Sequence, residues 1–548
     1  MCYTYYSFSE QLHERTDPMS DKKNQTFVEG ALILMIANIL VKVIGAIFKI
    51  PLNYLLGDDG MGYFGSAYMV YNWLFIVATA GMPVAISKMV AESAARGNTA
   101  EVRKIFSVGY RLLAVIGLAG FAFLLIFADK CAALMANPGA APGIRALAPA
   151  ILFVAIMSVY RGYFQGQQNM LPTAVSEVCE ALGKLVVGYG AAMLFIRHGI
   201  EKAAAGAVFG VSAGAIFGTI ALALIHLFSK KKQPPVAQSG QSVRSGGRLL
   251  KDLVKIAVPI TIGASVFSLT SLIDAAMIMR RLQDAAGFSY DAANNLWGAY
   301  SGKAITMFNL VPTLITAISI SIVPTIAGAF AVKNYAEAQS ATEGSIKITV
   351  LLTAPCAVGM SLLAGPILQL IFHSRSAEPT LSVLGYAIIF VSLVSLTNAI
   401  LQATGHAGLP VINMVIGGVT KVIVNYFLVG NPNINITGAP IGTNLCYIVI
   451  LALNLVSIHR IIRVRYNIVS LVIKPLISVA AMAAVVIALY GRVAPMGNLV
   501  ATVITIAAAG VVYAAVLLMV GGISENDIKM LPKSDKILPL MKKMKFIR

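Results

Sequence analysis

Apolar stretches of about 20 residues recur along the whole chain and are separated by short polar segments. A helix of about 20 apolar residues spans the roughly 30 Å hydrocarbon core of a bilayer. The pattern therefore predicts an all-α polytopic membrane protein with about fourteen transmembrane helices. The predicted spans are 29–50, 64–87, 105–128, 146–168, 172–196, 203–228, 252–279, 296–328, 346–371, 380–403, 409–430, 438–459, 468–490 and 498–521.

One helix–turn–helix sequence occurs twice, as RGYFQGQQNMLPTAVSEVCEALGK at 161–184 and NAILQATGHAGLPVINMVIGGVTK at 398–421. Each copy has a Gln before the turn, a Leu-Pro after it, and a Lys 19 residues after the Gln. A second pair of similar segments, 82–104 and 321–341, has nearly the same offset of roughly 240 residues. Repeats of this kind predict two homologous halves in parallel register, an arrangement typical of many transporters.

The repeat and the polar segments divide the chain into six parts. A linker rich in Pro, Gln, Ser and Gly separates two six-helix lobes related by pseudo-symmetry. The last two helices fall outside the twofold pattern, and we expect them at the periphery of the second lobe. The predicted parts are an N-terminal segment (1–28), the first lobe (29–228), the linker (229–251), the second lobe (252–466), two C-terminal helices (467–522) and a basic tail (523–548).

Composition agrees with this organisation: the 548 residues are 58% hydrophobic and 12% charged, and the mean hydropathy of +0.80 excludes a soluble protein. The net charge of +19 is unevenly distributed over the predicted loops. If the N-terminus is cytoplasmic, inward segments hold 24 Lys and Arg and outward loops hold 8, with the other 10 in helices. This asymmetry predicts that both termini and the linker are cytoplasmic, and it accounts for the charge without nucleic-acid binding.

The first 18 residues do not resemble a signal peptide, because no apolar segment follows a basic start. Met19 begins a more natural sequence, so 1–18 is either a mis-assigned start or an extension. The five cysteines are scattered and show neither metal-ligand nor disulfide spacing. Asp58 and Asp59 form the only paired-acid motif in a predicted loop. We expect no metal, no cofactor and no enzymatic activity, since no positioned nucleophile and base are found.

Polar and charged side chains inside the predicted spans form stripes along helix faces. They are the candidate functional residues, because ionisable groups inside a membrane are rare and usually functional. The candidates are Lys42 and Lys49 in the first span, Asn72 in the second, Glu177, Glu180 and Lys184 in the fifth, Asp274 in the seventh, Lys303 in the eighth and Lys421 in the eleventh.

Five of these residues are lysines, and a central Lys costs about 2.5–3.5 kcal/mol to insert. Five lysines facing lipid would cost about 12–18 kcal/mol, which exceeds or matches a typical net stability of about 5–15 kcal/mol. Only three acids were counted in the spans, so the lysines predict a net-cationic internal cavity suited to an anionic solute.

Structural explanations compete for some of these residues. Lys49 lies near the end of its span and could snorkel to the interface. Glu180 precedes Lys184 by four residues on one helix face, which is the favourable order for such a pair, so the two side chains can neutralise each other. Lys421 has no acid in its own helix, and Asp274 on the seventh span is its nearest plausible partner.

The segments AISKMVAES (85–93) and RGYFQGQQNMLPTAVSEVCE (161–180), together with the number of spans, resemble the multidrug/oligosaccharidyl-lipid/polysaccharide exporter superfamily. Within it, they are similar to the bacterial polysaccharide-export branch of stage V sporulation protein B-like proteins and MurJ-type lipid II flippases. The resemblance implies two lobes around a central cavity, alternating access, and an undecaprenyl-diphosphate-linked saccharide as substrate.

MurJ-type proteins line this cavity with basic residues on helices one, two and eight. Lys42 and Lys303 resemble the positions on helices one and eight, and Lys49 is one residue out of register with a second cation of helix one. Helix two has no basic residue here, and Asn72 lies in the corresponding region. The resemblance also implies that the last two helices form a groove for the lipid tail.

The expected function is therefore a flippase of the bacterial cytoplasmic membrane that translocates lipid II or a related glycan lipid for cell-wall or polysaccharide assembly. Two alternatives stay open: a cation-coupled multidrug exporter of the same superfamily, and a non-transporting scaffold in envelope assembly. Expected partners are the polyprenyl-diphosphate-linked glycan, membrane lipids and envelope biosynthesis proteins, with no nucleic acid. Membrane potential, sodium and protons are all open as driving forces.

Overall fold

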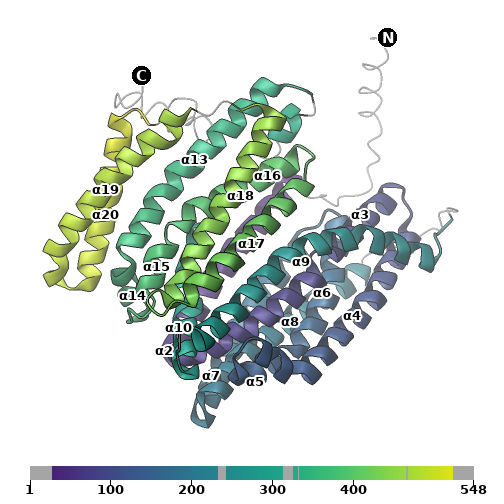
Figure 1. The fold of residues 1–548 in the computed structure, drawn as a ribbon. Helices are drawn as coiled ribbons and strands as arrows, with labels where there is room; N and C mark the ends of the chain where they lie inside the picture. Colours follow the sequence, from purple (N-terminus) through teal and green to yellow (C-terminus); the bar gives the residue numbers. More distant parts are fainter. Residues whose placement is uncertain (1–26, 232–241, 313–324, 331, 465–466, 523–548) are drawn as a thin grey trace.

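The computed structural model describes residues 27–231, 242–312, 325–330, 332–464 and 467–522, and every regular element in these ranges is helical (Figure 1). We name the first lobe the N-lobe and the second the C-lobe. The N-lobe contains α2 (Phe27–Thr79), α3 (Met82–Ala95), α4 (Thr99–Leu134), η1 (Pro138–Ala140), α5 (Ala141–Ala146), α6 (Ala148–Gly166), α7 (Leu171–Phe195), η2 (Ile196–His198) and α8 (Ile200–Lys231).

The C-lobe begins with α9 and includes one π-helix, η3, within the predicted eighth span. In the described ranges its elements are α9 (Gly246–Asp284), α10 (Tyr290–Ala299), η3 (Tyr300–Ala304), α11 (Ile305–Phe308), α13 (Tyr335–Leu362), α14 (Ala364–Phe372), α15 (Glu378–Leu384), α16 (Ala387–Ala403), α17 (Gly408–Val429), η4 (Asn435–Thr437) and α18 (Gly438–Ile462). The C-terminal elements are η5 (Val469–Ile473), α19 (Lys474–Val493), η6 (Ala494–Met496) and α20 (Asn498–Met519).

The prediction of an all-helical polytopic membrane fold is confirmed. In the described ranges, nine helices are long and apolar enough to cross a membrane, or up to eleven if two bent helix pairs each form one span. One of the nine, Ile33–Ala95, contains most of the first predicted span and all of the second, and the eighth predicted span falls partly outside the described residues. The total of fourteen therefore stays a prediction.

A break in α2 separates the first predicted span from the second. Gly57 has φ 63° and ψ −171°, a conformation that a side chain would strain and that glycine adopts freely. Asp58 follows directly, so its carboxylate lies at the break, eight residues after the end of the first predicted span. The two bent pairs are α5 with α6 and α15 with α16; they bend by 40° and 42°.

The repeated sequence folds into the same turn in both lobes. In each copy, the residue three positions after the Gln has left-handed backbone: Gln168 at φ 58° and Gly405 at φ 83°. Its N–H donates to the carbonyl of Gln165 in one copy and of Gln402 in the other, at 3.0 Å in both. The next N–H reaches the carbonyl preceding the Gln, at 3.0 and 2.9 Å, which completes a Schellman motif in each lobe.

The second pair of similar segments also shares its local structure, in the part of 321–341 that the structure describes. Helices α3 and α4 are joined at Gly97 (φ 72°), and the corresponding residue before α13 is Lys333 (φ 59°). The next residue is Asn98 in the first copy and Asn334 in the second. In each copy the Asn side chain caps the following helix by accepting a hydrogen bond from the N–H three residues on. The repeat predicted from sequence is therefore present in the backbone at both places.

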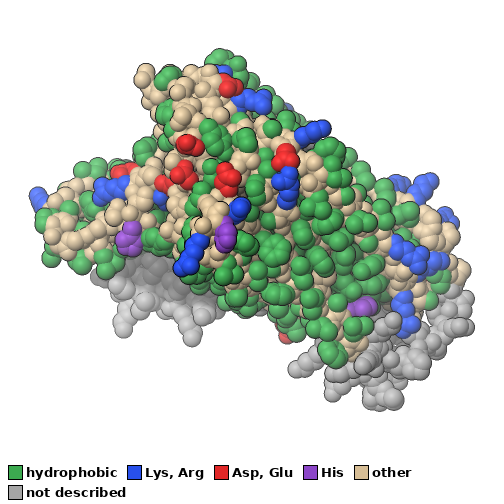
Figure 2. Space-filling model, turned by 90° about the horizontal axis from the view of Figure 1, so that it is seen from below, with side chains coloured by type: hydrophobic (Ala, Val, Ile, Leu, Met, Phe, Trp, Pro, Cys, Tyr) green, Lys and Arg blue, Asp and Glu red, His purple; other side chains and the backbone are tan. Residues whose placement is uncertain are grey.

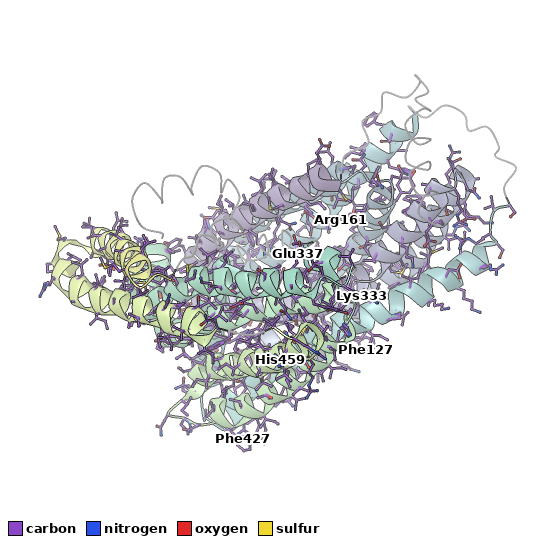
Figure 3. The ribbon with its side chains drawn as sticks, turned by 90° about the horizontal axis from the view of Figure 1, so that it is seen from above. Phe127, Arg161, Lys333, Glu337, Phe427 and His459 are labelled. Carbon is purple, nitrogen blue, oxygen red and sulfur yellow. The ribbon has the colours of Figure 1, made fainter. Side chains whose placement is uncertain are left out.

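The two lobes lie side by side, and α19 and α20 lie at the outer edge of the C-lobe (Figure 1). They pack on α13 and α14, and the view from above places them at the same edge (Figure 3). Helix α9 contacts α2, α3 and α4 of the N-lobe as well as α17 of the C-lobe, so it joins the two lobes.

Large apolar side chains cover much of the outer surface, as the view from below shows (Figure 2). Leu194 is 74% exposed and Met519 is 82% exposed. Such broad apolar exposure matches lipid rather than water as the surrounding solvent.

Candidate substrate site and lobe interface

The polar stripes predicted on the first and eighth spans face each other in the structure. The Lys49 ammonium donates to Thr306 Oγ1 at 3.1 Å, and Asn53 Nδ2 donates to the Gly302 carbonyl at 3.4 Å. The first pair of residues comes from α2 and α11, and the second from α2 and η3. The N-lobe and the C-lobe therefore meet along polar residues that sequence periodicity had placed on single helix faces.

Lys303 lies at the end of this contact and is ion-paired. Its ammonium is 2.7 Å from Asp58 Oδ1, and its side chain is only 5% exposed. It also donates to the hydroxyls of Ser374 and Ser376, each at 3.0 Å. The comparison of acids with lysines in the spans had left out Asp58, which had been assigned to a loop, and substrate binding by Lys303 stays a prediction.

A cluster of amides and hydroxyls extends the contact between the lobes beyond Lys303. Asn137 Nδ2 donates to Ser66 Oγ and to Asn294 Oδ1, each at 2.9 Å, and Asn137 Oδ1 accepts from the Tyr290 hydroxyl at 2.7 Å. The Asn294 amide in turn donates to the Asp59 carbonyl at 2.9 Å. Buried amides whose partners are in place hold elements in one arrangement.

Two glycines allow α2 and α10 to approach at backbone distance. A Cβ on Gly298 would lie 1.8 Å from the Asp58 carbonyl oxygen, and a Cβ on Gly62 would lie 2.2 Å from Asn294 Oδ1. No side chain fits at either place unless the helices separate.

A third contact joins Tyr54 of α2 to the end of α14. The Tyr54 hydroxyl is 2.5 Å from the Ile371 carbonyl and 2.6 Å from His373 Nδ1. We call the region of Tyr54, Asp58, Asn137, Asn294 and Lys303 the closed end of the molecule, because there the N-lobe and C-lobe are joined by direct contacts.

Lys42 lies about two turns before Lys49 on α2, farther from the closed end. Its side chain is exposed, and in the described ranges neither Lys42 nor Lys49 forms an ion pair with an acid. Among the residues that the structure describes, the first span therefore carries two cations without an acidic partner, whereas Lys303 is paired with Asp58.

The N-lobe candidates form a cluster around Arg161, which sequence reasoning had left out. The Arg161 guanidinium donates to Glu180 Oε2 at 3.0 Å and to Ser176 Oγ at 3.1 Å. Figure 3 labels Arg161 among the N-lobe helices. Glu177, one turn before Glu180, has a buried Oε2 without a hydrogen-bond partner in the described part of the chain.

The expected pairing of Glu180 with Lys184 is not observed, since Glu180 pairs with Arg161 from the preceding helix. The Lys184 ammonium lies over two rings instead, 5.4 Å from the centroid of Phe48 and 4.9 Å from that of Tyr68. Aromatic faces attract a cation and here replace a carboxylate. A small pocket of about 90 Å³ adjoins this site and is lined in part by Asn72, Glu180 and Lys184.

The predicted contact between Lys421 and Asp274 is confirmed. The Lys421 ammonium is 2.6 Å from Asp274 Oδ2, and the carboxylate side chain is 8% exposed. Asn425, one turn after Lys421, donates to the other oxygen of Asp274. Helices α9 and α17 are therefore tied by a buried ion pair that satisfies both carboxylate oxygens.

Arg244, just before α9, ties the linker to the N-lobe at the end of α9 opposite the closed end. Its guanidinium donates to Glu101 Oε1 at 2.7 Å and to Asp252 Oδ2 at 3.0 Å. Ser93 also donates to Glu101, at 2.8 Å. These contacts fix the start of α9 against α3 and α4.

Sequence reasoning missed Asp58, Arg161 and the pair Ser374 and Ser376. Asp58 had a usable signal, because an acid directly after a glycine at the end of a polar stripe can reach that stripe. Arg161 opens the repeated sequence and lies seven residues before the end of the predicted span 146–168, which marks it as an intramembrane charge. The serines follow α14 and have no signal of their own, since only the fold brings them to Lys303.

Comparison with known proteins gives a family match and relatives that span most of the chain. The model of the family described as polysaccharide biosynthesis protein matches residues 27–317. Stage V sporulation protein B of Bacillus subtilis (strain 168) is 26% identical over 450 residues, covering 81% of this chain and 86% of that protein. Lipid II flippase MurJ of the same organism is 27% identical over 456 residues, covering 79% and 82%.

Solved structures share the fold. A lipid II flippase MurJ in an inward closed conformation superposes with a TM-score of 0.67 at 14% identity, covering 88% of this chain and 98% of that chain. An inward-facing multidrug resistance transporter of the MATE family and MOP superfamily gives a TM-score of 0.65 at 16% identity, covering 77% and 95%.

Proposed function

The chain belongs to the polysaccharide biosynthesis protein family, and on that premise we propose that it is a flippase for an undecaprenyl-diphosphate-linked saccharide. It is a multi-pass membrane transporter of the MOP superfamily, related to MurJ and to stage V sporulation protein B. The proposed substrate is lipid II or a related glycan lipid, moved across the bacterial cytoplasmic membrane by alternating access. The proposal includes fourteen spans and cytoplasmic termini, and assigns the protein to cell-wall or polysaccharide assembly.

One observation carries the proposal: Lys42 and Lys49 have no acidic partner in the described ranges, whereas Lys303 is held by Asp58. A diphosphate is the anion that suits two lysines about two turns apart on one helix face, because the ammonium is a compact charge that binds phosphate well. The export of organic cations would favour acids in the cavity, and after Glu29 in the first turn of α2 the first span contains two lysines and no further acid.

The proposed cycle uses the closed end as a gate. With cytoplasmic termini, the closed end faces outward, and the substrate enters from the inner leaflet toward Lys42 and Lys49. When the closed end opens to the outside, α2 separates from α10 and η3, and the ion pair between Lys303 and Asp58 breaks. The freed Lys303 then offers a third cation to the diphosphate, while Asn72 contacts the saccharide and the lipid tail stays in the membrane.

The test is translocation of lipid II by the purified full-length chain in proteoliposomes. Translocation is measured as the accessibility of the lipid headgroup to a modifying enzyme added outside. We expect transfer with the unaltered chain, loss with Lys42→Ala plus Lys49→Ala, and partial activity with the arginine replacements, which keep the charge. Lys88→Ala is the matched control, since Lys88 is an exposed helix lysine 4.0 Å from Glu92.

Full transfer by the double alanine variant would remove these lysines from the mechanism. No transfer of lipid II or of other polyprenyl-diphosphate sugars by a well-folded chain, with efflux of organic cations instead, would favour the multidrug-exporter alternative. Absence of both activities would favour the scaffold.

A further inference from the structure

A second site lies outside the polar interface, on the membrane-facing seam between the two lobes. It is a pocket of about 510 Å³ with walls from α2 and α4 of the N-lobe and from α9 and α17 of the C-lobe. We call it the seam pocket. Its lining residues are Val70, Trp73, Leu74, Phe123, Cys131, Leu134, Met135, Leu272, Ile273, Ala276, Met277, Arg280, Arg281 and Tyr426.

The two arginines of the seam pocket differ in their contacts. Arg281 is part of the wall: its Nε donates to the Tyr426 carbonyl at 3.0 Å, and its Cζ lies 4.0 Å from the centroid of the Tyr426 ring. Arg280 is exposed, and in the described part of the chain it forms neither an ion pair nor a hydrogen bond. Asp284, one turn later, is also exposed and does not pair with it.

The position of Arg280 suits the level of lipid headgroups. It directly follows the predicted span 252–279 and precedes the end of α9 at Asp284 by one turn. The rest of the lining is almost entirely apolar, and Ile273 and Phe123 are 46% and 40% exposed at its walls. The seam pocket therefore presents one free guanidinium at its polar end and hydrocarbon-like walls below it.

We propose that the seam pocket binds an anionic phospholipid, with one acyl chain between the lobes and the phosphate paired with Arg280. The volume lies in the range of about 300–1,000 Å³ typical of ligand sites. An acyl chain gains little free energy by leaving one hydrocarbon environment for another, so the pocket contributes a matching shape for it. The Arg280 guanidinium selects for anionic headgroups. Because both lobes form the walls, the bound lipid bridges them in this conformation.

The site is independent of the transported substrate, since it faces the bilayer and shares no residue with the contacts of Lys42, Lys49 or Lys303. The chain carries a natural reporter for it: of only two tryptophans, Trp73 lines the seam pocket and Trp297 is 1% exposed at the closed end. Quenching of Trp73 by a lipid with brominated acyl chains therefore reports occupation of the pocket.

The experiment uses the purified full chain in mixed bilayers with brominated phosphatidylglycerol or brominated phosphatidylcholine of the same acyl chains. We expect half-maximal quenching at a mole fraction about fivefold lower for phosphatidylglycerol than for phosphatidylcholine. This is the factor in affinity that one basic residue contributes near an anionic lipid. The quenching should disappear in Trp73→Phe. The preference should disappear in Arg280→Gln and persist in Arg280→Lys and in Arg197→Gln, a control for an exposed arginine at the turn between α7 and α8.

Equal quenching by the two lipids in the unaltered chain would overturn the proposal, because it would indicate ordinary boundary lipid. A preference that survives Arg280→Gln, or one that is lost equally in Arg197→Gln, would also overturn it. Ala276→Phe provides a second variant that keeps Arg280: it fills the pocket and should reduce quenching by both lipids. Unchanged quenching in that variant would place the lipid elsewhere.

Discussion

Lys303 and Asp58 form an ion pair of 2.7 Å between the two lobes, and Asp58 reaches it only because Gly57 breaks α2. The lysine side chain is 5% exposed and the aspartate 17%. Two charges taken this far from water depend on each other, since either one alone would be buried without compensation. The pair therefore couples the burial of each residue to the closed arrangement of α2 and η3.

The first prediction concerns the separate removal of these charges. Asp58→Asn should destabilise the protein by about 3–5 kcal/mol, the usual cost of leaving one partner of a buried pair alone. The double variant Asp58→Asn with Lys303→Gln should lose less than the sum of the single variants. Unfolding of the purified protein measures both values, and Lys88→Gln, which breaks an exposed pair, should change stability by less than about 0.5 kcal/mol. Additive losses in the double variant would show that the pair has no coupling energy.

The glycines of the closed end give a second prediction. Gly298→Ala places a methyl group 1.8 Å from the Asp58 carbonyl, so α10 and α2 must separate. We expect a loss of about 1–3 kcal/mol from overpacking and increased labelling of a cysteine introduced at Asn294. Gly190→Ala is the matched control within α7, since nothing lies within 4 Å of its added Cβ. Equal labelling in the two variants would contradict the proposed role of this contact as a gate.

A third prediction follows from Lys421 and Asp274. Lys421→Ala leaves a buried carboxylate with only the Asn425 amide, so membrane levels or transport should fall, and adding Asp274→Asn should restore part of the loss. A double-mutant comparison of membrane level and complementation measures the coupling. If the two single effects simply add, Lys421 acts by another route, most directly by contact with substrate.

The N-lobe cluster gives a fourth prediction, in which the structure reverses the partner expected from sequence. Glu180→Gln should rescue Arg161→Ala and should not rescue Lys184→Ala, because Glu180 accepts from Arg161 while Lys184 lies over aromatic rings. Tyr68→Leu should instead mimic part of the effect of Lys184→Ala, since it removes one of the two ring faces. Rescue of Lys184→Ala by Glu180→Gln would mean that the helix-surface pair is the functional one.

Local features of the fold were predictable where a short sequence decides the structure. The two Gln-containing turns and the two Asn caps recur at constant offset, and their hydrogen bonds are made within five residues of the chain. Turn and cap chemistry of this kind depends on neighbouring residues alone. Helix positions were predictable for a related reason, because each apolar stretch must satisfy its backbone inside the bilayer without help from other elements.

Candidate residues could be identified from the pattern on single helix faces, whereas only some of their ion-pair partners could be identified in this way. The match of Lys421 with Asp274 was inferred by elimination, since no acid lay in the lysine's own helix. No partner was inferred for Lys303, and the partner inferred for Lys184 from a spacing of four residues is not observed. Asp58 lay outside the counted spans, and Arg161 competed for Glu180 from another helix at a distance that no sequence spacing encodes.

The sequence by itself determined the membrane class, the repeated segments and the faces on which charged residues lie, because bilayer thickness and helix periodicity act on each segment separately. Only the tertiary structure decided which charges neutralise each other. Pairing depends on how helices far apart in the chain approach, as when the break at Gly57 and the π-helix η3 bring Asp58 to Lys303. It also decided which cations keep no acidic partner in the described ranges: Lys42 and Lys49 beside the polar interface, and Arg280 on the membrane-facing seam.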